Sequence, residues 1–212
     1  MEPKDKVRWI YSSRDNQELA ERYDQWAREY DQDLESAFGW LGPQYAAEYL
    51  EKYVPKDARI LDAGAGTGLT GKLLFDRGYR ELAAMDISRG MLEQARRKTV
   101  YKEFHQMVMG EPLNFPSDCF DAVVSVGALT LGHAPASSLD ELVRITRPGG
   151  HVIFTLRTDV HAEGGFKERQ DALAQAGQWT LVEKTEGFQA LPKGEPDVLL
   201  QVWVYQTLAS DR

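Results

Sequence analysis

The stretch that decides the fold is Arg59-Ile60-Leu61-Asp62-Ala63-Gly64-Ala65-Gly66-Thr67-Gly68-Leu69-Thr70-Gly71. An apolar run ends at a carboxylate, three glycines follow at every second position, and leucines at helical spacing come next. This pattern predicts a strand, a glycine loop and the N-terminus of a helix. Glycine permits the unusual φ angles of such a loop, and a helix N-terminus directs N–H groups at negative or polar ligand groups. We therefore expect a ligand site at this loop.

Two ligand classes fit the loop. Residues 66–71 spell G-x-G-x-x-G, the fingerprint of dinucleotide-binding folds. Residues 64–68 spell G-x-G-x-G after Asp62, which resembles motif I of the class I S-adenosylmethionine-dependent methyltransferases. The dinucleotide fingerprint begins directly at the strand end, so taking Gly66 as its first glycine leaves residues 62–65 unexplained. The position of the strand therefore favours the methyltransferase resemblance.

The next apolar run, residues 82–86, ends at Asp86. A carboxylate at this place can accept hydrogen bonds from both hydroxyls of a ribose, which is common to both cofactor classes. Its context, from Asp86 and Ile87 to Met91, resembles the methyltransferase pattern in which apolar residues flank the adenine. Further matches at residues 115–126 and 144–155 resemble the fourth strand, the following helix and turn, and the fifth strand. Their order along the chain supports the same family.

The family resemblance implies a methyltransferase that uses S-adenosylmethionine. A narrower similarity, to the methyltransferase-like proteins of the Williams–Beuren region type, rests on Tyr23-Asp24-Gln25-Trp26-Ala27 and Tyr30-Asp31. Many relatives have an acidic residue after the third strand that binds the adenine amino group, but here Met109 and Gly110 fall at that place. Either Glu111 substitutes for it, or backbone groups read the adenine edge. The cofactor-binding residues implied by the resemblance are Tyr30, Asp62, Gly64, Ala65, Gly66, Gly68, Asp86, Ile87, Met91, Met109, Gly110, Glu111, Ser125 and Val126.

The alternation of apolar runs and amphipathic segments predicts an α/β domain spanning residues 1–212, with a parallel sheet covered by helices on both faces. We place strands at 58–62, 82–86, 104–109, 121–126, 151–156, 179–186 and 198–207, the last two as an antiparallel hairpin. Helices are expected to begin near Thr67, Ser88, Ser138 and Phe166, with a capping box at residues 138–141. The family resemblance implies a Rossmann-like, seven-stranded mixed sheet of order 3-2-1-4-5-7-6, with strand 7 antiparallel.

Residues 1–57 are expected to form an N-terminal helical cap on a core of residues 58–212. Residues 1–15 are polar and are predicted to be frayed. From Asn16 to Leu34, apolar and aromatic residues recur every three or four positions, which predicts one helix. Pro43 is well placed to begin a second helix. Within the aromatic stripe, Tyr30 is the residue we expect at the methionine end of the cofactor, although such spacing also suits simple packing.

Composition and net charge limit the classes of partner and the compartment that we expect for this protein. The net charge of −8 disfavours a nucleic-acid substrate, because phosphate binding needs a basic surface. No apolar run is long enough to cross a bilayer, and no secretory signal is visible at the N-terminus. The single cysteine, Cys119, fits a reducing compartment, so a cytoplasmic protein is expected. We see no spacing of metal ligands.

No catalytic residue is required by this chemistry, because the methyl donor is already activated and the protein mainly positions donor and acceptor. His133, in the loop after the fourth strand, is the one candidate for a general base, although a structural loop histidine is the favoured interpretation. Arg157 could bind an acidic acceptor or form a surface ion pair. The acceptor, whether small molecule or protein, is left open. The alternatives are an NAD(P)-dependent oxidoreductase and a cofactor-binding protein without transfer activity.

Overall fold

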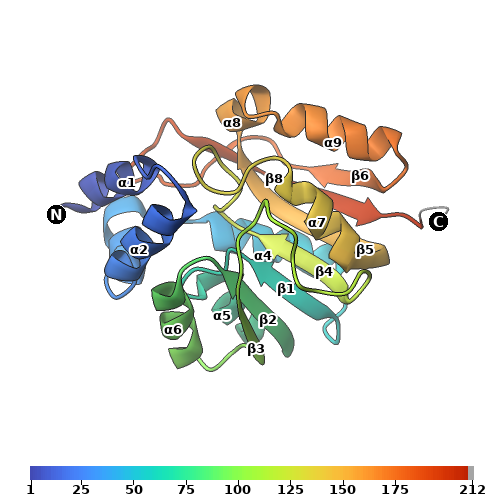
Figure 1. The fold of residues 1–212 in the computed structure, drawn as a ribbon, viewed down its shortest axis with the longest axis horizontal. Helices are drawn as coiled ribbons and strands as arrows, with labels where there is room; N and C mark the ends of the chain where they lie inside the picture. Colours follow the sequence, from blue (N-terminus) through green and yellow to red (C-terminus); the bar gives the residue numbers. More distant parts are fainter. Residues whose placement is uncertain (210–212) are drawn as a thin grey trace.

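The computed structural model describes residues 1–209, which form a mixed β-sheet between two layers of helices (Figure 1). The strand order is β3-β2-β1-β4-β5-β8-β6, and a short strand, β7, pairs with β8. The strands are β1 (Arg59–Ala63), β2 (Glu81–Asp86), β3 (Glu103–Gln106), β4 (Phe120–Ser125), β5 (Thr146–Arg157), β6 (Trp179–Lys184), β7 (Phe188–Gln189) and β8 (Leu199–Thr207). The predicted order and its antiparallel end are confirmed.

The parallel half of the sheet is made of short apolar strands buried on both faces. Four consecutive residues of β1 are buried, and β2 and β4 show the same pattern. Parallel strands covered by helices on both sides read as continuous apolar runs, which is why the sequence located them closely. Because β1 pairs with β2 on one side and β4 on the other, the ends of these three strands meet at one sheet edge.

Three details of the sheet differ from the prediction. Strand β3 ends at Gln106 rather than at residue 109, because the chain turns away there and residues 107–109 line a pocket. The predicted strand 179–186 ends at Lys184 after a bulge between Leu181 and Glu183. Strand β7 lies in the segment predicted to be a loop, where two residues pair with the start of β8.

Helices cover both faces of the sheet, as predicted. One layer consists of α4 (Gly42–Tyr53), α5 (Leu69–Asp76) and α6 (Arg89–Arg97), whose apolar residues join one core cluster with β1 and β2. The other consists of α7 (Ser138–Ile145), α8 (Thr158–Glu163) and α9 (Phe166–Gln175), which pack on the opposite face. Helix α4 therefore packs directly on the sheet, unlike the helices that precede it.

The remaining helices gather at one end of the molecule, far from the C-terminal end of β8 (Figure 1). They are α1 (Pro3–Tyr11), α2 (Asn16–Trp26), α3 (Tyr30–Asp33) and the π-helical turn η1 (Leu34–Phe38). The prediction that residues 1–15 are frayed is wrong. Helix α1 buries Ile10, which is 1% exposed, against Leu19 and Trp26, and Lys6 pairs with Asp33 at 2.8 Å.

The single helix predicted from Asn16 to Leu34 is also interrupted. Helix α2 ends at Trp26, and the chain turns before α3, so that the indole N–H of Trp26 donates to Asp33 at 2.7 Å. The capping box predicted for α7 is absent, although the helix begins at Ser138 as expected. Ser138 is the first helical residue rather than the cap, and its buried hydroxyl has no partner in the described chain. Glu141 instead accepts from the Leu113 N–H at 2.7 Å.

Candidate cofactor and acceptor sites

The glycine loop connects β1 to α5, and its backbone is shaped as expected. Gly64, Gly66 and Gly68 all have φ between +54° and +88°. Four of the loop N–H groups, however, already donate within the protein. Those of Gly64 and Ala65 donate to the Met85 carbonyl at 2.8 and 2.9 Å, that of Gly66 donates to the Asp86 carboxylate at 2.8 Å, and that of Gly68 donates to the Ala65 carbonyl at 2.9 Å. A cradle for a diphosphate needs free N–H groups, and these four residues do not supply them.

Asp62 lies beneath the loop, not in the pocket that the loop borders. It is 1% exposed, and the Tyr101 hydroxyl donates to its Oδ2 at 2.5 Å. The same hydroxyl accepts from the Gly71 N–H at 3.1 Å, so Tyr101 ties the strand end to helix α5. Burial raises the pKa of Asp62 to about 7, because the charged form loses its hydration there. The structure thus places Asp62 as a support of the loop.

Asp86 occupies the place expected for a ribose-binding carboxylate. One oxygen accepts from Gly66 N–H and the other accepts from Ser88 N–H, both at 2.8 Å. Each oxygen keeps further lone pairs that face the pocket. Burial raises the pKa of Asp86 to about 6, against the lowering effect of these backbone donors and with a smaller contribution from the negative charge of Asp24. The Asp86 carboxylate thus links the glycine loop to the start of α6, and it also lines a pocket at this edge of the sheet.

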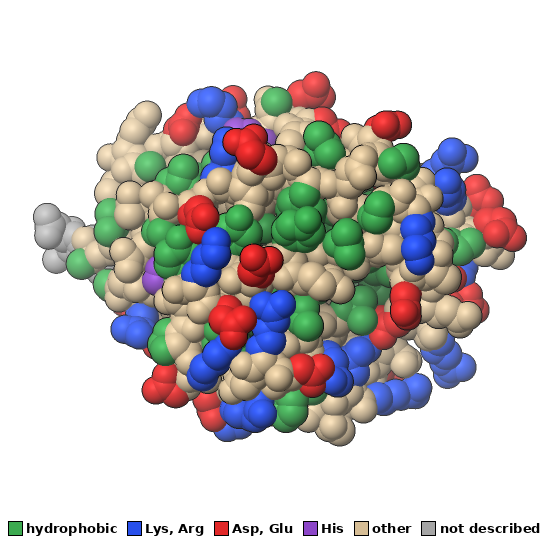
Figure 2. Space-filling view, turned by 180° about the vertical axis from the view of Figure 1, so that it is seen from behind, with side chains coloured by type: hydrophobic (Ala, Val, Ile, Leu, Met, Phe, Trp, Pro, Cys, Tyr) green, Lys and Arg blue, Asp and Glu red, His purple; other side chains and the backbone are tan. Residues whose placement is uncertain are grey.

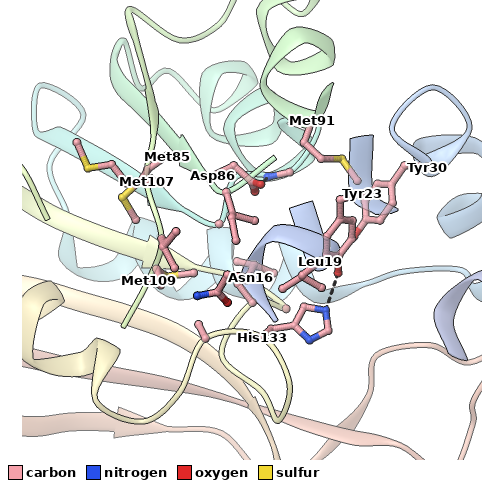
Figure 3. Close-up of a pocket in the computed structure, with 18 residues that line it drawn as sticks. Asn16, Leu19, Tyr23, Tyr30, Met85, Asp86, Met91, Met107, Met109 and His133 are labelled. Carbon is pink, nitrogen blue, oxygen red and sulfur yellow. Dashed lines mark hydrogen bonds between the residues drawn. The ribbon is translucent and has the colours of Figure 1, made fainter. Parts of the chain in front are cut away.

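A first pocket of about 670 Å³ lies at this edge of the sheet (Figure 3). Eight of the expected cofactor-binding residues line it: Tyr30, Gly64, Gly66, Asp86, Ile87, Met91, Met109 and Val126. Six others lie outside its lining: Asp62, Ala65, Gly68, Gly110, Glu111 and Ser125. The lining residues that were not expected to bind the cofactor are Asn16, Leu19, Tyr23, Met85, Met107, Val108, Gly127, Ala128 and Ala134, together with His133, which was expected only as a base.

Methionines line the first pocket on two sides, and we call the side formed by Met85, Met107 and Met109 the methionine wall. Four of the five methionines of the chain line it, namely Met85, Met91, Met107 and Met109. Figure 3 shows Met85, Met107 and Met109 on one side of Asp86 and Met91 on the other. Thioether side chains adapt to flat apolar surfaces, so this wall suits an aromatic base. Glu111 is exposed and outside the lining, whereas residues 107–109 belong to it.

His133 meets Tyr23 at the mouth of the first pocket (Figure 3). The Tyr23 hydroxyl and His133 Nε2 are 2.8 Å apart, and His133 Nδ1 lies 3.4 Å from the Leu131 carbonyl. A carbonyl only accepts, so Nδ1 carries the proton and Nε2 accepts from Tyr23. Burial lowers the pKa of His133 and raises that of Tyr23, because both charged forms lose hydration. The pair is therefore a neutral imidazole and a neutral phenol.

A second pocket of about 820 Å³ adjoins the first and shares four lining residues with it: Tyr23, Tyr30, Val126 and Gly127. It extends from α1 and the cap aromatics to the end of β5 and the chain between β7 and β8. The predicted candidate Arg157 lies in this lining and forms the predicted ion pair, with Asp159 at 2.7 Å, while its binding of an acidic acceptor stays a prediction. The two pockets are therefore neighbours that meet at these four residues.

Two carboxylates of the N-terminal helices attach them to the core beside the first pocket. Asp24 accepts from the Ser88 hydroxyl at 2.5 Å and from the Gly90 N–H at 2.6 Å. Asp31 accepts from the Thr67 hydroxyl of the glycine loop and pairs with Lys98 at 2.6 Å. Gly90 permits the close approach, because a Cβ there would lie 2.8 Å from the Asp24 backbone. We call these contacts the Asp24 and Asp31 latches.

Charged side chains of both signs are mixed on the surface. On the face seen in Figure 2, basic side chains lie among acidic ones rather than in a band, as suits a chain of net charge −8. No helix within residues 1–209 is both long enough and apolar enough to span a membrane.

Comparison with known proteins agrees with this geometry. The methyltransferase domain family matches residues 61–154. The chain is 38% identical over 177 residues to Methyltransferase-like protein 27 of Homo sapiens, which covers 80% of the chain and 69% of that protein. It is 38% identical over 97 residues to the demethylmenaquinone methyltransferase of Clavibacter sepedonicus, covering 45% and 39%.

The fold is shared with a chain of the complex between the Haloferax volcanii Trm112 methyltransferase activator and the putative methyltransferase. The TM-score is 0.68 at 20% identity, covering 88% of this chain and 98% of that one. Sheet order, glycine loop and relatives agree, and they set aside both the NAD(P) alternative and a protein without transfer activity. The chain belongs to the class I S-adenosylmethionine-dependent methyltransferases.

Proposed function

We propose that the first pocket holds S-adenosylmethionine, that the second holds a small-molecule acceptor, and that the methyl group passes between them where the pockets meet. The observation that carries this proposal is the shared lining of Tyr23, Tyr30, Val126 and Gly127. In-line transfer requires donor and acceptor to face each other across a short gap, with water excluded. Two adjoining chambers with a common wall meet that requirement.

The first pocket fits the cofactor. A Cβ at Gly66 would meet no atom within 4 Å, so it would project into open space where a ligand is expected. Asp86 would accept from the ribose hydroxyls, and the methionine wall would cover the adenine. The cofactor supplies an activated methyl group when bound. Tyr23 and Tyr30 line the junction, where their ring faces would favour a positively charged sulfur by about 1 kcal/mol.

Tyr23 and His133 are the groups that would receive a proton from the acceptor. Since Tyr23 donates its proton to His133 Nε2, a lone pair of its oxygen is left toward the junction. An acceptor hydroxyl or amine placed there could pass its proton to Tyr23 while Tyr23 passes its own to His133. The neutral imidazole is the protonation state that such a relay needs.

A small molecule suits the second pocket better than a protein side chain. Its walls come from α1, α2 and the chain between β7 and β8, so elements from both ends of the sequence close around it. We infer that the functional cap is α1 to η1, with α4 a part of the core layer. We further infer that the chain is one of the methyltransferase-like proteins of the Williams–Beuren region type, which it resembles at residues 23–31, and that it works in the cytoplasm, as its single cysteine suggests.

Calorimetric titration tests the cofactor half of the proposal. S-adenosylhomocysteine, the product form of the cofactor, should bind with micromolar affinity, while NAD should give no heat at the same concentrations. Binding of NAD alone would overturn the assignment of the first pocket. The acceptor half is tested by release of S-adenosylhomocysteine from S-adenosylmethionine in the presence of candidate small molecules, and by its absence with protein acceptors.

A further inference from the structure

The two charged residues that line the second pocket lie outside the lining that it shares with the first. Arg157 belongs to the end of β5, and Glu195 belongs to the chain between β7 and β8, whereas Thr155 of β5 accepts from the N–H of the junction residue Gly127 at 2.9 Å. None of these three lines the first pocket. A ligand that fills the second pocket therefore presents one part to the junction and another to the polar end formed by Arg157 and Glu195.

The charges at the polar end are unequal. The guanidinium of Arg157 is held by Asp159 through two hydrogen bonds, at 3.0 and 2.7 Å. Glu195 lines the same pocket, and its carboxylate forms no hydrogen bond or ion pair with any of residues 1–209. Counting these three groups, the polar end has one carboxylate in excess. The charge of Glu195 also helps to raise the pKa of Arg157, but Glu195 has no ion pair of its own in the described part of the chain, so the excess negative charge at this end favours a cationic ligand group.

Two further features point to a ligand of this kind. The Thr130 hydroxyl lines the second pocket, is 5% exposed and has no hydrogen-bond partner in the described chain. Buried hydroxyls are normally paired, so an orphan in a pocket wall indicates a polar ligand atom. Tyr11 and Trp40 line the second pocket but not the first, so their rings do not face the cofactor chamber. Aromatic faces attract organic cations.

We propose that the methyl acceptor is a small molecule with an apolar or aromatic body and a cationic amine, the amine bound by Glu195 and the atom to be methylated lying at the junction beside Tyr23. This inference rests on the proposed function, because it takes the second pocket as the acceptor chamber. The amine serves recognition and is separate from the methylated atom. Arg157, already paired with Asp159, positions the end of β5 and leaves Glu195 as the charge partner.

Three phenols test whether the second pocket prefers a cationic ligand. They share a phenol ring with a two-carbon chain and differ in the charge of the group on that chain. Tyramine, 4-ethylphenol and 3-(4-hydroxyphenyl)propionate are titrated by calorimetry into the protein saturated with S-adenosylhomocysteine. We expect tyramine to bind at least about tenfold more tightly than the propionate, because only tyramine places a charge-assisted hydrogen bond on Glu195. Glu195→Gln should remove this preference and leave the affinity for 4-ethylphenol within about twofold, since only the charged contact is lost.

The matched control is Asp197→Asn, which removes a carboxylate from an exposed position in the same segment, outside the pocket lining. It should keep the preference for tyramine. A preference that survives Glu195→Gln, tyramine that fails to bind, or tighter binding of the propionate that is lost in Arg157→Gln would each overturn the inference. Intact binding of S-adenosylhomocysteine in those cases leaves the proposed function standing, whereas loss of that binding overturns both.

Discussion

The two sides of the first pocket are built in different ways. On the core side, the glycine loop and Asp86 are held by backbone hydrogen bonds among strands that are buried on both faces. On the cap side, α2 and α3 are attached through two side-chain carboxylates, the Asp24 and Asp31 latches. Backbone pairing within a sheet opens only with the fold, whereas a few polar contacts can open locally. We therefore expect a rigid core side and a cap side that moves.

Substitutions on the two sides of the first pocket should change cofactor affinity by different amounts. Replacing a core-side residue should change cofactor binding strongly, because the ligand contacts that side directly. Replacing a latch residue should act through the population of the closed cap, which limits its effect on affinity. The predictions below start on the core side and end with a variant that should leave binding intact.

The largest effect is expected from Gly66→Val. The new side chain would project into the first pocket, and a β-branched residue at φ +54° adds backbone strain. We expect S-adenosylhomocysteine affinity to fall at least about a hundredfold, since the side chain occupies the ligand site. The control is Gly149→Val, at φ +78° and also facing open space but far from the pocket lining. Equal loss of affinity in both variants would contradict a direct role of the loop.

Asp86→Ala should have the next largest effect. The carboxylate would be lost both as the acceptor for Gly66 and Ser88 and as the expected ribose acceptor, so affinity should fall at least about tenfold. Circular dichroism checks that the fold is kept. Asp86 must be ionised to accept hydrogen bonds from both ribose hydroxyls, and its pKa is about 6. The affinity of the wild-type protein for S-adenosylhomocysteine should therefore weaken as the pH falls below that value. In Asp86→Asn this pH dependence should vanish; if it persists, another group controls it.

The latches should have a smaller effect on affinity and a clear effect on motion. In Asp24→Ala combined with Asp31→Ala, we expect affinity to fall by about threefold to tenfold, because ligand binding must also restore the closed cap. Hydrogen exchange of amides in residues 16–34 should become faster, while that of β1 and β4 stays unchanged. Glu21→Ala, which removes only an exposed contact to Gln17 on α2, is the control. Unchanged protection of the cap would show that other contacts hold it closed.

Asp62→Asn should leave binding almost unchanged and alter the pH dependence of stability. The pKa of Asp62 rises from 3.8 to about 7 on folding, so between these values the native state binds the proton more tightly than the unfolded state does. Stability must therefore fall as pH rises through this window. We expect urea denaturation to show that this fall is smaller in the variant, by about 3 kcal/mol between about pH 4 and about pH 7. Parallel curves for both proteins would assign the slope to other groups.

The contrast between core and cap also explains what the sequence could predict. The strand, loop and helix around Gly66 are local, and their apolar runs and glycines lie within a few residues of one another. Tyr23 and His133 are 110 residues apart, and no local pattern brings them together. The second pocket joins Ile10 to Leu200, so it depends on tertiary packing that periodicity does not report. In the sequence, Asp24 and Asp31 belong only to a family resemblance, which predicts no contact for either of them.

The most direct test of the account is the place of the methyl group itself. S-adenosylmethionine labelled with carbon-13 at that methyl can be bound to the protein, and nuclear Overhauser effects from the methyl protons can be measured by NMR. We expect contacts to the ring protons of Tyr23 and Tyr30 and to the methyl groups of Val126, the residues shared by both pockets. Contacts confined to the methionine wall, at Met107 and Met109, would contradict the proposed junction and the assignment of the second pocket as the acceptor chamber.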